Sequence, residues 1–152
     1  MNEKRRPDRK LNFELVPDGC WGYNLRSVLT SAQWNYIRQT AKERASGKCM
    51  ICGAKTDRPH THEKWSYDEK KHVAKLEDVL SVCAKCHSAI HIGRTQLLGN
   101  SYAAEKHYMK VNGISYAEYR ADLGFANDEN RRLSRISEWA LDLSFLKKYL
   151  GL

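Results

Sequence analysis

Residues 82–91 read Val-Cys-Ala-Lys-Cys-His-Ser-Ala-Ile-His, and a matching Cys-Met-Ile-Cys occupies residues 49–52. Cysteines three positions apart can turn back on one ion, and two such pairs complete a tetrahedral shell of four thiolates. The spacing therefore predicts one structural zinc ion with four ligands: Cys49, Cys52, Cys83 and Cys86. Structural zinc can contribute on the order of 10 kcal/mol of apparent folding free energy, so we expect it to decide whether residues 49–93 fold.

A disulfide framework fits these cysteines less well than a metal site. The sequence shows no secretory signal peptide and no apolar run long enough to span a membrane. The expected setting is therefore a reducing cytoplasm, without a membrane partner. The fifth cysteine, Cys20, is expected to be an ordinary buried thiol.

Length and charge limit the classes of function. The chain has 152 residues and a formal net charge of +8. This length predicts one domain, at residues 11–152, after a flexible basic arm at residues 1–10. The arm either tracks phosphates or is a solvated tail. The positive charge favours a polyanionic partner such as nucleic acid over a neutral metabolite.

Two patterns precede the first cysteine pair. Apolar residues alternate over residues 11–15, which predicts a short strand before a turn at residues 17–19. Thr30 and Gln33 are spaced as a capping box, which predicts an amphipathic helix over residues 31–46. The helix and the residue after it carry basic side chains that either contact nucleic-acid phosphates or are merely solvated: Arg38, Lys42, Arg44 and Lys48.

The segment between the cysteine pairs predicts two strands, at residues 60–65 and 76–82, with a polar loop at residues 68–71. Residues 86–92 then read as a short helix closed by Gly93. The predicted order is strand, strand, helix, with cysteines at both ends.

More helices are expected towards the C-terminus. One ends at residues 112–113, the next opens at the Ser115 and Glu118 capping box and stops before Gly124, and a third lies around residues 133–140. Alternating apolar residues over 139–145 predict a closing strand that pairs with residues 11–15. We therefore expect an α+β fold in which a helical part, residues 100–152, packs around a zinc-stapled core at about residues 49–93.

A second metal site is predicted on the helix after the second cysteine pair. His87 and His91 lie four residues apart, so both imidazoles project from one helical face and can share an ion. This helix is expected to face the strand that carries His62 and Glu63. Three histidine ligands would leave positions open for water and a phosphate oxygen, as metal-assisted phosphodiester cleavage requires.

These residues resemble the HNH endonucleases, whose ββα-metal module carries a strand-borne histidine or aspartate and a helix with a ligand in a Cys-x-x-Cys-His sequence. The spacing of His87 and His91 is also similar to that in the colicin-type branch. The likeness extends to a poorly characterised group of bacterial and phage HNH proteins. It does so through Trp34 and through residues 62–68, 91–93 and 139–144, so that it covers most of the chain after Gly19.

The resemblance implies a ββα-metal (HNH) module with flanking N- and C-terminal helices, in a bacterial cell or phage-infected host. It implies cleavage of nucleic acid, DNA being favoured over RNA, with a catalytic Mg²⁺, Mn²⁺, Ni²⁺ or Zn²⁺. The implied catalytic residues are His62, Glu63, His87 and His91.

Two registers of the first motif strand stay open. Either His62 binds the metal and Glu63 is the base, or Thr61 takes the ligand position and His62 is the base. A glutamate is the weaker base because of its low unperturbed pKa. Asp78 occupies the position of the motif's middle asparagine.

Three other histidines lie outside the motif residues. Residues two apart share a face of a strand, so His60 joins His62 at the metal, as ligand or base, if the strand is regular there. His72 resembles a position that the related group also fills with histidine, and His107 is expected to have no role.

Other classes of function remain open on this sequence. The departures at Glu63 and Asp78 favour a catalytically inactive, zinc-stabilised module that binds nucleic acid, or an anti-defence or adaptor protein with a protein partner. A zinc-dependent hydrolase of a different substrate fits less well, because the His-Glu-x-x-His helix of such enzymes is lacking.

Overall fold

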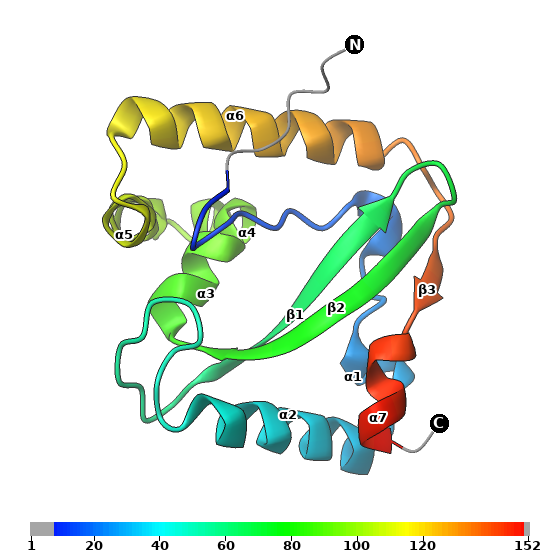
Figure 1. Ribbon diagram of the computed structural model, residues 1–152. Helices are drawn as coiled ribbons and strands as arrows, with labels where there is room; N and C mark the ends of the chain where they lie inside the picture. The colour runs from blue at the N-terminus through cyan, green and yellow to red at the C-terminus, as the bar shows by residue number, and fades with distance from the viewer. Residues whose placement is uncertain (1–7, 151–152) are drawn as a thin grey trace.

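The computed structural model describes residues 8–150 as an α+β fold with one three-stranded sheet (Figure 1). The strands are β1 (His60–Asp68), β2 (Val73–Val82) and β3 (Ala140–Asp142). The α-helices are α1 (Leu25–Val28), α2 (Ser31–Ala45), α3 (Ala84–Ile90), α4 (Ile92–Leu97), α5 (Ser101–Asn112), α6 (Tyr116–Leu133) and α7 (Lys147–Leu150). Short 3₁₀ helices lie at Asp18–Cys20 and Ser144–Leu146. The expected α+β class is confirmed.

Strands β1 and β2 form the antiparallel hairpin that the sequence predicts between the cysteine pairs. His62 lies opposite Leu80, and the pairing shifts by one residue between Lys64 and Trp65. The residues before this shift, His60 to Lys64, therefore alternate regularly between the two faces of the hairpin. His60 and His62 lie on one face, and Glu63 lies on the other.

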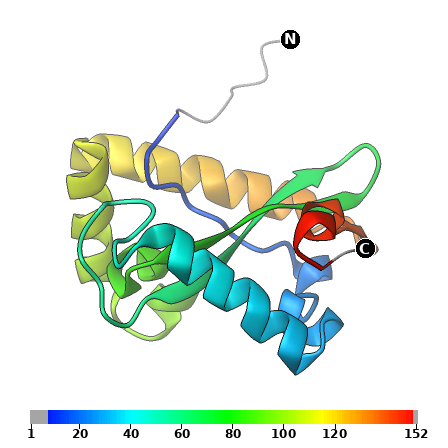
Figure 2. The same ribbon diagram turned by 60° about the horizontal axis from the view of Figure 1, so that its bottom comes forward.

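Helix α2 covers one face of the hairpin, and the N-terminal segment runs between the other face and α6 (Figure 1 and Figure 2). The Thr30 capping box at the start of α2 is present as predicted, and the helix ends at Ser46 in the left-handed conformation. Ile37 and Ala41 of α2 pack in one core with Leu76 and Val79 of β2. The other face contacts α3 and the N-terminal segment.

The N-terminal segment is extended but is not a strand, so the strand expected at residues 11–15 is wrong. Its alternation does bury Leu11 and Phe13, and Phe13 stacks on Tyr108 with ring centroids 4.2 Å apart. Side chains take the place of a neighbouring strand. The Asn112 side chain bonds the Leu11 N–H and C=O, and Asn130 donates to the carbonyls of Leu15 and Val16.

A basic arm is expected at residues 1–10, and residues 1–7 of it lie outside the described residues. The described part is held rather than free, because Arg9 Nε lies 2.9 Å from an Asp122 carboxylate oxygen. Asp122 is buried, and its carboxylate also accepts a hydrogen bond from the Tyr108 hydroxyl.

Three predicted boundaries after the second cysteine pair are wrong. Gly93 lies inside α4 rather than ending a helix, and α6 continues through Gly124 to Leu133. Glycine costs only about 1 kcal/mol inside a helix, which the packing of α6 outweighs. The chain after Leu133 forms no helix around residues 133–140. The closing strand, β3, pairs in parallel with Val73–Lys75 of β2 instead of with residues 11–15.

Candidate metal centres

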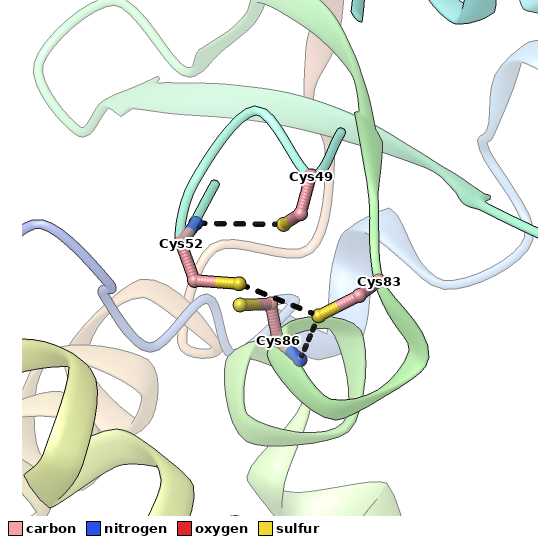
Figure 3. Close-up of side chains that lie close together, drawn as sticks. All are labelled: Cys49, Cys52, Cys83 and Cys86. Atoms are coloured by element: carbon pink, nitrogen blue, oxygen red, sulfur yellow. Dashed lines mark hydrogen bonds between the residues drawn. The ribbon is translucent and has the colours of Figure 1, made fainter. Parts of the chain in front are cut away.

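The two Cys-x-x-Cys turns bring four sulfurs together at the start of α3 (Figure 3). Cys49 and Cys52 lie in a turn beside the bridge between Lys48 and Lys55, and Cys83 is the N-cap of α3. The four Sγ atoms lie within 4.8 Å of one another, and Cys52 Sγ lies 3.8 Å from Cys83 Sγ. A tetrahedral zinc with Zn–S bonds of about 2.3 Å separates its sulfurs by about 3.8 Å. The geometry therefore fits a structural metal such as zinc.

Backbone N–H groups donate to two of these sulfurs, those of Cys49 and Cys83. Ile51 and Cys52 donate to Cys49 Sγ, at 3.4 and 3.5 Å, and Cys86 donates to Cys83 Sγ at 3.4 Å. Although burial alone would raise it, hydrogen bonds from backbone N–H groups, first that of Cys52, lower the pKa of Cys49 to about 7. Burial and then the negative charge of Cys49 raise the pKa of Cys86. A bound cation would offset both of these costs, as a thiolate metal site requires.

His107 adds a contact that the sequence interpretation missed. Its Nε2 lies 3.2 Å from Cys86 Sγ, where an N–H can donate to a thiolate. Burial lowers the pKa of His107, so the ring is neutral at pH 7. His107 is separated from Cys86 by most of α3, α4 and half of α5, and no spacing rule connects the two residues.

Three histidines form a second cluster. His62, the member that lies on β1, is buried, with 2 % of its surface exposed. His62 meets His87 of α3 and His91, which caps the C-terminal end of α3, with one nitrogen of each ring within 4.8 Å of the others. Burial lowers the pKa of His91, and it lowers the pKa of His87 to about 3. Both rings are therefore neutral at pH 7, the form that binds metals. The structure brings together the three predicted histidine ligands.

Glu14 completes the surroundings of this cluster, and the sequence interpretation missed it. Its Oε2 lies 3.0 Å from His62 Nε2. The other ring nitrogen, Nδ1, is buried and has no hydrogen-bond partner among residues 8–150. The only sequence signal is that Glu14 stands between two apolar residues of the alternating segment, Phe13 and Leu15, and so points away from their side.

Glu63 is not brought into the cluster. It lies on the opposite face of β1, where its Oε1 accepts the Leu25 N–H at 2.9 Å. Burial raises the pKa of this carboxyl. Glu63 therefore has a structural role, because its carboxylate binds the first backbone N–H of α1.

His60 and His72 have different surroundings. His60 lies on the cluster face at its exposed edge, with Nδ1 3.0 Å from His87 Nδ1. His60 does not belong to the set of His62, His87 and His91, whose ligand nitrogens all lie within 4.8 Å of one another. His72 lies at the opposite end of the hairpin, in the turn, where its φ is 54° and its ring neighbours Trp139. The structure therefore does not bring His72 to the site.

Asp78 and the predicted nucleic-acid contacts lie on the α2 side. Asp78 Oδ1 accepts the Val79 N–H at 2.7 Å and pairs with Arg44 at 3.3 Å. The other predicted basic residues, Arg38, Lys42 and Lys48, are exposed. Lys42 and Lys48 line a surface cavity of about 230 Å³ that reaches Pro59, next to His60.

Comparisons with protein-family models, curated proteins and solved structures found no match to this chain. None of the helices within residues 8–150 has the length and apolar character needed to cross a bilayer.

Proposed function

We propose that this protein is an HNH-type, metal-dependent endonuclease in which His62, His87 and His91 hold a catalytic divalent cation. One observation carries the proposal: three histidines from β1, α3 and the C-cap of α3 converge, and His62 Nδ1 is buried without a partner among the described residues. A buried acceptor without a partner costs about 1–3 kcal/mol, which a bound cation would offset. The succession of β1, β2 and α3 beside a four-cysteine cluster is consistent with a ββα-metal module.

The cation would supply charge stabilisation at a scissile phosphate and bind the attacking water. Among the described residues, His60 is the side chain best situated to take the proton from that water. It is exposed, lies at the rim of the cluster and shares a face with His62. Glu63 is a poorer candidate base, because its carboxylate is directed to Leu25 on the far face.

The basic surface supports nucleic acid as the substrate. The net charge is +8, and Lys42 and Lys48 flank a cavity that reaches the start of β1. Lysines in such positions can neutralise backbone phosphates without reading sequence. DNA is the favoured substrate over RNA.

Cleavage assays with matched histidine variants test the proposal. Zinc-loaded protein is incubated with supercoiled DNA, single-stranded DNA or RNA in the presence of Mg²⁺, Mn²⁺, Ni²⁺ or Zn²⁺. We expect His87→Ala and His91→Ala to abolish cleavage while they retain the structural zinc and most of the DNA affinity. His72→Ala, far from the cluster, is the control and should cleave normally. Full activity of His87→Ala would overturn the proposal.

A second candidate is a module that binds nucleic acid or a protein without cutting. The position of Glu63 favours it, because the residue next to His62 is the family's base position and here it faces away from the cluster. This candidate predicts salt-sensitive DNA binding and no cleavage with any of the four metals. The same assay therefore separates the two functions.

A further inference from the structure

We infer that Glu14 is a positioning residue for the histidine cluster, which orients His62 from behind and presents its Nδ1 lone pair to a metal ion. The inference rests on the proposed metal centre and adds a residue from outside the strand, strand and helix unit.

The hydrogen-bond chemistry of His62 fixes which nitrogen is free. A carboxylate only accepts hydrogen bonds, so the His62 Nε2 that lies 3.0 Å from Glu14 must carry the proton. In the neutral ring the other nitrogen, Nδ1, is then the acceptor with the lone pair. That atom is the buried one without a partner among residues 8–150.

The Glu14 carboxylate is not part of the histidine set. Among the described residues, the ligand atoms of this set that lie within 4.8 Å of one another come from His62, His87 and His91. A carboxylate that bonds the far nitrogen of a metal-binding histidine fixes the tautomer and the ring orientation, and it makes the imidazole a stronger ligand.

Glu14 also contacts α3, which carries His87 and is capped by His91. The Glu14 N–H donates to the Ile90 carbonyl at 2.9 Å. Glu14 thus contacts His62 through its side chain and Ile90, the residue before His91, through its main chain.

The backbone on both sides of Glu14 is anchored. Asn112 bonds the main chain of Leu11, and Asn130 bonds the carbonyls of Leu15 and Val16. The carboxylate therefore approaches His62 from a segment with little freedom, as a positioning group requires.

The test measures metal binding and tautomer in the full chain. Zinc-loaded wild type, Glu14→Gln and His62→Ala are titrated with Ni²⁺ by calorimetry, with Glu138→Gln as a control that makes the same charge change at an exposed site. We expect the wild type and the control to bind one additional Ni²⁺, His62→Ala to lose it, and Glu14→Gln to bind it roughly 10- to 100-fold more weakly. Imidazole ¹⁵N NMR of the wild type without Ni²⁺ should show the Nε2–H tautomer of His62.

The outcomes distinguish a failure of the Glu14 role from a failure of the metal centre. If the wild type binds Ni²⁺ and Glu14→Gln binds it equally well, the role of Glu14 is overturned while the metal centre stands. An Nδ1–H tautomer of His62 in the wild type would also overturn that role. If the wild type binds no Ni²⁺ beyond its zinc, or His62→Ala binds it normally, the proposed metal centre fails.

Discussion

The replacement Cys86→Ser should cost the protein both its structural metal and much of its thermal stability. Cys86 is fully buried, and it packs in one hydrophobic core with Cys49, Val82 and Ile90. Serine offers a hydroxyl, which does not replace a thiolate ligand of zinc. The three remaining cysteines would then leave the turn at Cys49 without a firm connection to α3.

Mass action gives the size of the effect. When free zinc stands at a thousand times the dissociation constant, binding to the folded state alone contributes about 4.1 kcal/mol. In a protein of about this size, each kcal/mol lost from the free energy of unfolding lowers Tm by roughly 2–4 °C. Losing the zinc term should therefore lower Tm by about 8–16 °C, and by more if zinc binds more tightly.

Thermal melting and zinc content, measured on the same samples, check this estimate. Cys20→Ala is the matched control, because Cys20 is also buried but lies outside the sulfur cluster, and burial raises its pKa to about 11. The control should keep one zinc and melt within a few degrees of the wild type. If Cys86→Ser also keeps one zinc per chain and melts like the control, Cys86 is not a ligand of a structural zinc that stabilises the fold.

Acidification and two glycine replacements give further expectations. The folded chain holds the pKa of His87 at about 3, against about 6.5 when unfolded, so the unfolded state binds the extra proton between these values and the free energy of unfolding should fall as pH drops below about 6.5. Urea unfolding at pH 7 and pH 5 measures this fall, which should be smaller in His87→Ala. Gly19→Ala should destabilise by about 1–3 kcal/mol, since the added Cβ would lie 2.7 Å from the Ile136 carbonyl oxygen. Gly124→Ala, with open space around its Cβ inside α6, should instead stabilise by up to about 1 kcal/mol; denaturant midpoints that rank the two variants the other way would contradict the packing.

The parts of the site that follow from local geometry were predictable. Two Cys-x-x-Cys turns and a histidine pair one helical turn apart are short-range patterns, and the chain brings them together as expected. Strand alternation likewise predicted that His60 shares the face of His62, and this is confirmed because the register shift comes only after Lys64. The same alternation sends Glu63 to the far face, which the resemblance alone did not reveal.

The rest depends on tertiary packing. Glu14 reaches His62, and His107 reaches Cys86, across long stretches of chain with no periodicity to connect them. The alternation at residues 11–15 predicted burial correctly but not a strand, because a strand also needs a neighbouring backbone. Here that need is met by the side chains of Asn112 and Asn130.

The anchoring of the N-terminal segment also sets an order of events during synthesis. The residues that hold Leu11 and Leu15 follow them by 101 and 115 positions. Because loops this long close late and slowly, β1, β2 and α3 leave the ribosome well before Glu14 can be fixed behind His62. A nascent chain that ends before α6 therefore carries all three histidines and Glu14, but it lacks Asn130, which holds the carbonyls of Leu15 and Val16.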